Sequence, residues 1–251
     1  MSEHWINANP SPLAEKQQPI FSDPQVKQPL HLNLPQLPVD QIDRKKLSDL
    51  RVGDAVLLSG YLYTMRDAGH QRCLQELRKS GELPFGLTGQ AVFYAGPTAA
   101  SAGRPFASIG PTTASRMDFA APELYQAGIC LTLGKGMRSA AVADSCAQTG
   151  SVHLSAVGGA AALLARSVLE AELLAWEDLG PEALYRLRVK DLPAFVTIDA
   201  RGVQFDVMQR PEISSLAPTI LPSTCPSLSS MLPSSASPTL LTPPKGDCQH
   251  E

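Results

Sequence analysis

Short apolar segments alternate with amphipathic ones along the middle of this chain, and this alternation constrains the fold more than any other feature. The segment from Asp54 to Met65 is typical of a strand, and Asp67 is placed to cap a helix that runs to Lys79 and ends at Gly81. Further strands are predicted over residues 91–95, 106–109, 129–133, 152–156, 184–189, 195–199 and 203–205, and further helices over 122–127, 139–149 and 159–167. This pattern predicts the α/β class, with a mixed sheet packed by helices.

Composition divides the 251 residues into three parts. Residues 1–29 are polar and punctuated by proline, which indicates a flexible segment. Residues 30–208 carry the strand and helix patterns and form the predicted domain. Serine and proline dominate residues 209–251. Because proline removes backbone donors and blocks helices, we expect this last segment to be a disordered tail.

Charge and hydropathy exclude several classes of partner. The net charge is −3 and no basic block stands out, so we expect no nucleic-acid partner. The N-terminus lacks a basic segment followed by an apolar run, so no secretory signal is visible. The most apolar long stretch, residues 155–176, contains Arg166, Glu170 and Glu172, which are unfavourable in a bilayer. We therefore expect a cytoplasmic protein that has no membrane partner.

The cysteines favour neither disulfides nor a metal site in this chain. There are five, an odd number, and none forms a CxxC pair, so a disulfide framework or a structural zinc site fits poorly. Cys73 and Cys146 lie on predicted helices and Cys130 in a predicted strand, and we expect all three to be buried. Cys225 and Cys248 belong to the tail.

The densest group of chemical side chains lies in the turn from Ser108 to Asp118. Gly110-Pro111 is predicted to end a short strand there, and Thr112 or Thr113 can then cap a short helix. Backbone N–H groups, hydroxyls and Arg116 would point into one small volume, which suits a carboxylate or a phosphate. The turn alone favours the simpler interpretation, a capped loop with a surface arginine.

Two further cations lie where predicted strands give way to loops. Arg66 ends a strand and could hold a carboxylate in a bidentate fork, or it could simply pair with Asp67 on the surface. His70 lies one turn after Asp67, so the two side chains could touch, and we assign His70 a supporting role. Lys135 lies between two glycines, which let the backbone approach a ligand, although the spacing is not that of a Walker A loop.

Five segments of the chain carry a family resemblance. The turn Gly110-Pro111-Thr112-Thr113-x-x-Arg116-Met117-Asp118 resembles the signature of the β region of iron–sulfur hydro-lyases, the class I fumarases and L(+)-tartrate dehydratases. Similar in order and spacing are Ser59-Gly60-x-x-Tyr63-Thr64-x-Arg66-Asp67-x-x-His70, then Gly134-Lys135-Gly136-x-Arg138-Ser139, and the later blocks 157–164 and 177–183. The resemblance covers about residues 32–205.

The resemblance implies a swivelling-type β/β/α domain that acts on a small dicarboxylate. It makes Thr112 the catalytic residue and Arg66, Arg116 and Lys135 the substrate-binding cations. We expect Asp67, His70 and Thr113 to position these residues without contacting the substrate. The segment that begins Glu177-Asp178 is interpreted as an ordinary loop and helix start outside the site.

The implied enzyme has two kinds of chain. Because the family's cluster-binding cysteines belong to the α region, the resemblance places a 4Fe–4S cluster on a partner α subunit, in an α2β2-type assembly, and makes this chain the β subunit. The implied reaction is the hydration of fumarate to malate. A β subunit of L(+)-tartrate dehydratase and a non-catalytic dicarboxylate-binding module remain the alternatives.

Overall fold

The computed structural model describes residues 28–37, 39–98 and 105–205. The predicted flexible N-terminal segment and the predicted tail lie almost entirely outside these residues, so both stay predictions. The described elements are β1 (Leu30–Asn33), α1 (Arg44–Asp49), β2 (Ala55–Thr64), α2 (Asp67–Ser80), η3 (Pro84–Gly86), β3 (Ala91–Phe93), β4 (Ala95–Pro97), β5 (Ile109–Pro111), η4 (Ala114–Met117), α3 (Ala121–Gln126), β6 (Leu131–Gly134), α4 (Ala140–Thr149), β7 (Val152–Ser155), α5 (Ala161–Arg166), β8 (Val168–Ala175), η5 (Glu177–Glu182) and β9 (Leu184–Ile198).

A mixed sheet forms the centre of the domain, in the order β1-β2-β3-β6-β7-β9-β8. The first five strands of this order are parallel to their neighbours, whereas β9 is antiparallel to β7, to β8 and also to β2. Strands β2, β3, β6, β7 and β9 therefore close into a ring of pairings. The short strands β4 and β5 pair separately as an antiparallel hairpin.

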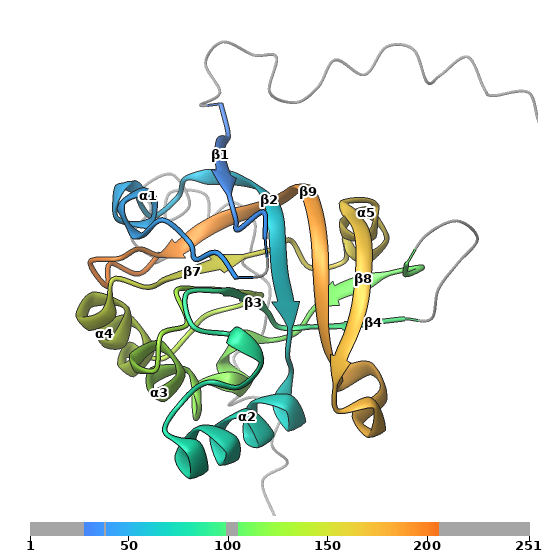
Figure 1. Ribbon diagram of the computed structural model, residues 1–251. Coiled ribbons are helices and arrows are strands. Elements are labelled where there is room, and N and C mark those ends of the chain that lie inside the picture. The colour runs from blue at the N-terminus through green and yellow to red at the C-terminus, as the bar shows by residue number, and fades with distance from the viewer. Residues whose placement is uncertain (1–27, 38, 99–104, 206–251) are drawn as a thin grey trace, which may run out of the picture. The chain divides into compact units, whose positions relative to one another are not determined.

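Helices pack on the sheet around two apolar clusters, which confirms the predicted α/β class. Helices α2, α3 and α4 lie together on one side (Figure 1), where Leu74, Leu124 and Val142 join one buried cluster. Leu47 of α1 and Leu164 of α5 belong to the other cluster, with residues of β1, β2, β6 and β9. The assignment to the swivelling type stays a prediction.

The sequence predicts most elements of this core closely. Strand β2 and helices α2 and α4 begin and end within one residue of expectation, and α2 and α4 end at Gly81 and Gly150, both in the left-handed region. The prediction for β5 was wrong, because Gly110 and Pro111 lie inside this strand rather than after it. The expected strand at residues 203–205 is reduced to a single bridge between Ile198 and Gln204.

The prediction of two late strands was also wrong, because residues 184–198 form one strand, β9. The irregularity that suggested a break is local. Asp191 has a φ of 51°, and its N–H donates to the Ser59 hydroxyl over 2.9 Å, beside a register shift in β2. A side chain of the neighbouring strand thus accepts the hydrogen bond that the ladder loses, and pairing continues on both sides.

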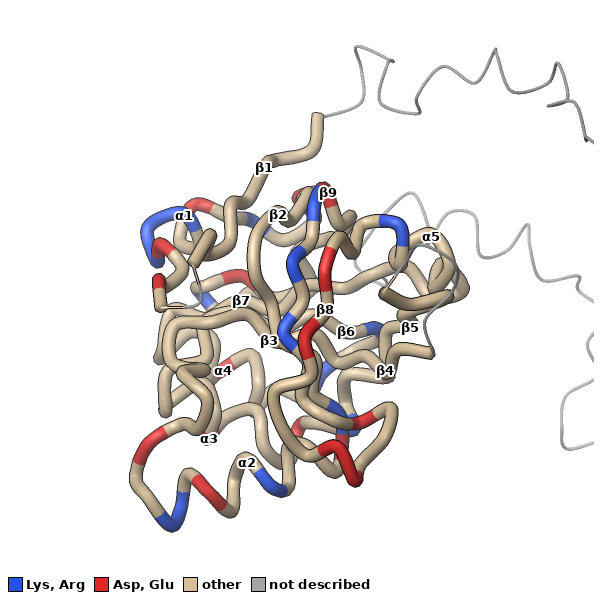
Figure 2. The backbone as a smooth tube through the Cα atoms, turned by 45° about the vertical axis from the view of Figure 1, so that its right-hand side comes forward, with Lys and Arg blue, Asp and Glu red and all other residues tan. Residues whose placement is uncertain are grey.

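Strand β8 was not predicted, because its run of Leu, Glu and Ala is more typical of a helix. Tertiary contacts override that preference. Glu170 and Glu172 each pair with an arginine of β9, Arg188 and Arg186, at 2.8 and 2.5 Å. Figure 2 shows these acidic and basic residues side by side on the two strands.

In the described part of the chain, no helix has both the length and the apolar character needed to cross a bilayer. Burial of the three described cysteines is confirmed, although Cys130 precedes β6 rather than lying in it.

Candidate functional site

The candidate site lies where the parallel strands end. Arg66 follows β2, Tyr94 follows β3 and Lys135 follows β6. Because parallel strands have their carboxyl ends at the same edge of a sheet, residues 28 to 69 positions apart in sequence meet there.

The backbone joins the turn that carries Thr112 to the loop that carries Lys135. The N–H of Thr112 donates to the Tyr94 carbonyl over 2.6 Å, and the N–H of Lys135 donates to the Thr112 carbonyl over 3.1 Å. Gly134 makes this approach possible, because a Cβ there would lie 3.0 Å from the Ala114 side chain and 3.3 Å from the Thr112 carbonyl oxygen. The half-buried side chains of Thr112 and Lys135 are thus held on adjacent strand ends.

Thr113 lies at the start of η4, as predicted, but its side chain makes no capping hydrogen bond. Its exposed side chain contributes little to the turn, whereas its backbone forms a parallel bridge with Lys135. The hydrogen bond from the Ala114 N–H to the Lys135 carbonyl, over 2.7 Å, completes this junction. Backbone pairing therefore orders the turn, and the side-chain cap that we predicted for Thr113 does not form.

Arg116 reaches the start of α2, where its Nη2 lies 2.9 Å from Oδ1 of Asp67. Asp67 was predicted to be the N-cap of this helix, but Arg66 occupies the cap and Asp67 belongs to the first turn. A carboxylate in the first turn interacts favourably with the helix dipole, and here it also orients Arg116. The ion pair connects the turn of Thr112 to the residue that follows Arg66.

Arg66 is enclosed between β4 and the end of η5. Its Nη2 lies 3.5 Å from Oε1 of Glu182, and both side chains are 23% exposed. Gly96 allows this placement, because a Cβ on it would lie 2.8 Å from Nη1 of Arg66. Gly96 pairs with Gly110, two residues before Thr112, so Arg66 lies beside the same hairpin that leads into the turn.

His70 does not hydrogen-bond to Asp67, contrary to one expectation. Its Nδ1 lies 2.8 Å from the Arg66 carbonyl, which can only accept, so Nδ1 carries the proton. Burial lowers the pKa of His70 to about 4, helped by the charge of Arg138. Its ring meets Tyr94 edge to face at 4.9 Å. A neutral, buried His70 at pH 7 supports the backbone of Arg66 and has no free charge for catalysis.

Arg138 is a residue of the site that the analysis of the sequence missed, although it lies in the quoted motif around Lys135. Its side chain is 1% exposed, and its Nε donates to Oδ1 of Asp118 over 2.6 Å. The other oxygen of Asp118 accepts the N–H of Ser139 over 2.7 Å. Asp118 ends the turn of Arg116, so this pair fastens that turn to the loop of Lys135.

A buried polar network continues from Arg138 into the core. Nδ1 of His153 accepts from Nη1 of Arg138 over 3.2 Å and from the Thr132 hydroxyl over 2.8 Å. Thr132 also hydrogen-bonds to the hydroxyl of Tyr125. Burial, and then the charge of Arg138, hold the pKa of His153 well below its usual range. The network is therefore neutral apart from Arg138, whose charge is balanced by Asp118.

The described cysteines do not suit an iron–sulfur cluster. Burial raises the pKa values of Cys73 and Cys146 to about 12 and also raises the pKa of Cys130, so all three stay protonated thiols, whereas thiolates bind iron. Within the described residues, no three His, Cys, Asp or Glu side chains gather in a way that could hold a metal ion.

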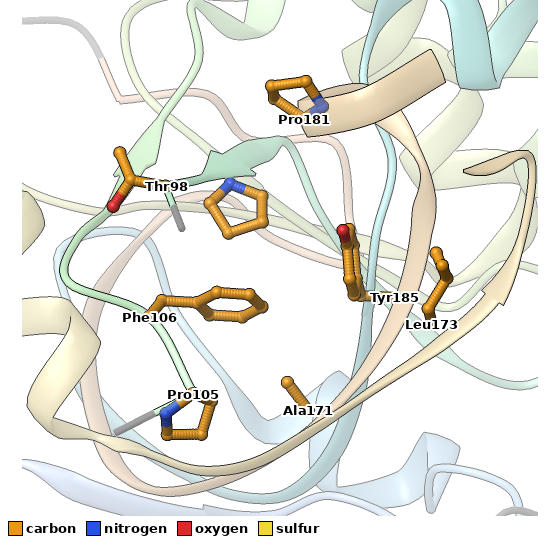
Figure 3. A pocket seen from close by; sticks show the side chains of 8 residues that line it. Thr98, Pro105, Phe106, Ala171, Leu173, Pro181 and Tyr185 are labelled. Carbon is orange, nitrogen blue, oxygen red and sulfur yellow. The ribbon is translucent and has the colours of Figure 1, made fainter. Parts of the chain in front are cut away.

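A separate apolar pocket of about 440 Å³ lies between the β4–β5 hairpin and strands β8 and β9 (Figure 3). Its described lining is uncharged and consists of Pro97, Thr98, Pro105, Phe106, Ala171, Leu173, Pro181 and Tyr185. A dicarboxylate needs cationic partners, so this pocket is not the place for it. Arg66, Arg116 and Lys135 lie outside this lining.

The loops that carry three cations and a hydroxyl thus come together beside the carboxyl ends of the parallel strands in an α/β domain. The sequence profile of the fumarase C-terminus matches residues 7–208, and the chain belongs to this family.

Relatives at 38–40% identity carry two kinds of name. Fumarate hydratase 2 of Leishmania major is 40% identical over 169 residues, which cover 66% of this chain and 29% of the relative. The anaerobic class I fumarate hydratase of Escherichia coli K12 is also 40% identical, over 64% of this chain and 30% of its own length. The L(+)-tartrate dehydratase subunit beta of the same bacterium is 38% identical over 64% of this chain and 81% of the subunit. The chain thus spans less than a third of the matched fumarate hydratases.

Proposed function

We propose that this chain is the β subunit of a hydro-lyase that adds water reversibly across the carbon–carbon double bond of a small dicarboxylate, with fumarate and malate as the substrate pair. The observation that carries the proposal is the contact between the strand-end loops of Arg66, Thr112, Arg116 and Lys135. Membership of the fumarase C-terminus family supports it.

The cations have two tasks in this proposal. A dicarboxylate has two negative ends, and the three cations Arg66, Arg116 and Lys135 would bind both ends and fix the carbons between them. Arginine suits this role because its planar guanidinium matches the two oxygens of a carboxylate. The ion pair with Asp67 and the contact with Glu182 orient the two arginines before substrate arrives.

Thr112 is the proposed catalytic residue and moves a proton at a substrate carbon. A threonine hydroxyl is a weak base unless neighbouring groups stabilise its ionised form. Arg116, four residues on, and Lys135, paired through the backbone, supply positive charge for this purpose. The hydrogen bond from the Thr112 N–H to Tyr94 fixes the backbone that carries the hydroxyl.

A partner α subunit completes the proposed enzyme. The residues of the described part do not suit a 4Fe–4S cluster, so we assign the cluster to that partner and the assembly to the α2β2 type. The match over 81% of a tartrate dehydratase subunit beta favours a separate subunit, and it makes L(+)-tartrate the second candidate substrate. A module that binds dicarboxylates without catalysis is the remaining alternative, and the cytoplasm the proposed location.

Anaerobic reconstitution of this chain with an α-type partner, iron and sulfide tests the proposal. We expect the reconstituted pair to hydrate fumarate and to show no preference for tartrate. This chain alone should be inactive. Thr112→Val keeps the shape but removes the hydroxyl, so kcat should collapse while substrate binding changes little. Arg116→Lys loses the fork and should mainly weaken binding.

Ser115→Ala is the matched control, because Ser115 lies in the same turn and its side chain is exposed. Its activity should equal that of the unmodified pair. Full activity of Thr112→Val would refute the catalytic role, and dicarboxylate binding without turnover in the reconstituted pair would favour the module.

A further inference from the structure

The guanidinium of Arg66 has a closely defined place beside Glu182. On one side Gly96 leaves no room for a side chain, since a Cβ there would lie 2.8 Å from Nη1 of Arg66 and 3.3 Å from the Pro181 carbonyl oxygen. On another side Oε1 of Glu182 lies 3.5 Å from Nη2. The guanidinium therefore lies between the backbone of Gly96 and a fixed carboxylate.

Glu182 is itself held at the start of α2. Its Oε2 accepts the N–H of Ala68 over 2.8 Å, one of the first-turn donors that lack a partner within the helix. One oxygen of the carboxylate is thus bound to the backbone, and the other faces Arg66. The carboxylate cannot turn away without losing a hydrogen bond.

The segment that carries Glu182 is fastened to α2 at two more points. Nη1 and Nη2 of Arg72 donate to the two carboxylate oxygens of Asp178 over 2.7 and 2.5 Å. The indole N–H of Trp176 donates to Glu76 over 3.2 Å. Pro181, the residue before Glu182, borders the apolar pocket of Figure 3. This segment, expected to lie outside the site, is therefore a wall beside Arg66.

We propose that Glu182 is a positioning residue for substrate binding, which holds the Arg66 guanidinium so that its remaining donors face one carboxylate of the substrate. This inference rests on the proposed function. Without the carboxylate, Arg66 would keep its charge but lose its orientation, and a bidentate contact depends on orientation. Binding of the dicarboxylate should then weaken more than turnover.

Glu182→Gln tests this in the reconstituted pair. The amide oxygen can still accept the Ala68 N–H, while the amide N–H₂ faces the guanidinium as a donor. We expect KM for fumarate to rise about tenfold, kcat to change less than threefold and the melting temperature to stay within about 2 °C. Glu177→Gln, an exposed glutamate in the same segment, is the matched control and should behave as the unmodified chain.

A lower KM in Glu182→Gln would overturn the proposal, because it would mean that Glu182 merely repels the dicarboxylate. A double-mutant cycle separates positioning from a general structural effect. In the Arg66→Ala background, Glu182→Gln should change KM less than twofold, and an undiminished effect there would also overturn the proposal.

The NMR signal of the Arg66 Nε–H, a group shielded from water, provides a test on the full chain alone that needs no activity. It should be sharp in the unmodified chain and in Glu177→Gln, and broadened or shifted in Glu182→Gln. An unchanged signal in Glu182→Gln would refute the positioning role. If the reconstituted pair acts on no dicarboxylate, the proposed function fails, and this measurement still decides whether Glu182 fixes Arg66.

Discussion

Acidification should destabilise this domain through His70, and the size of the effect follows from its burial. The pKa of His70 is about 4 in the folded protein, against 6.5 for the free side chain, because burial disfavours the charged form. At pH 7 the imidazole is mostly neutral in both states and contributes little pH dependence. Between pH 6.5 and 4 the unfolded chain binds a proton that the folded domain does not. The free energy of unfolding therefore decreases as the pH is lowered through this range. The shift corresponds to a loss of about 3 kcal/mol by pH 4.

His70→Gln isolates this contribution, since glutamine keeps a side-chain donor for the Arg66 carbonyl but does not titrate. Urea unfolding at pH 7, 6, 5 and 4.5 should show a flatter pH dependence for His70→Gln than for the unmodified chain. His153 shifts in the same direction in both proteins and cancels in the comparison. If His70→Gln loses stability with acid as steeply as the unmodified chain, the reasoning is wrong.

Two further substitutions test the contacts that hold the site together. Arg138→Met removes the buried partner of Asp118 and should lower the free energy of unfolding, measured in urea, by about 3 kcal/mol. Arg188→Met, in an exposed ion pair, should lower it by less than about 1 kcal/mol. Equal losses would contradict the conclusion that Arg138 holds the turn of Arg116 in place. Gly96→Ala should displace the Arg66 guanidinium, which is the flexible end of its side chain. KM for fumarate should then rise in the reconstituted pair, with little change in melting temperature. An unchanged KM would show that Arg66 does not need this position.

Local patterns were sufficient for most of the core elements. Strand β2, helix α2 and its end at Gly81 follow from hydrophobic period and from the conformational freedom of glycine, which act within a few residues. The motif around Thr112, Arg116 and Lys135 indicated a family, and the match of the fumarase C-terminus profile confirms that family. The roles of these residues stay predictions.

Contacts between distant residues could not be read from the sequence. Asp67 was expected to cap its own helix, yet its partner is Arg116, 49 positions away. Backbone hydrogen bonds hold the turn of Arg116 against the ends of β3 and β6, and β2, which precedes Asp67, ends at the same edge of the sheet. Glu182 was assigned to a loop outside the site, yet η5 returns to the start of α2 and brings it to Arg66.

The sequence by itself determined which segments become strands and helices and which side chains carry charge, because propensity, period and turn chemistry act locally. The tertiary structure decided which charges meet. Strand β8 shows the limit of local preference, since pairing with β9 makes a strand of a segment rich in Leu, Glu and Ala. The pairing of β2 with β9 brings Glu182, just before β9, beside Arg66, just after β2, because the two strands run antiparallel.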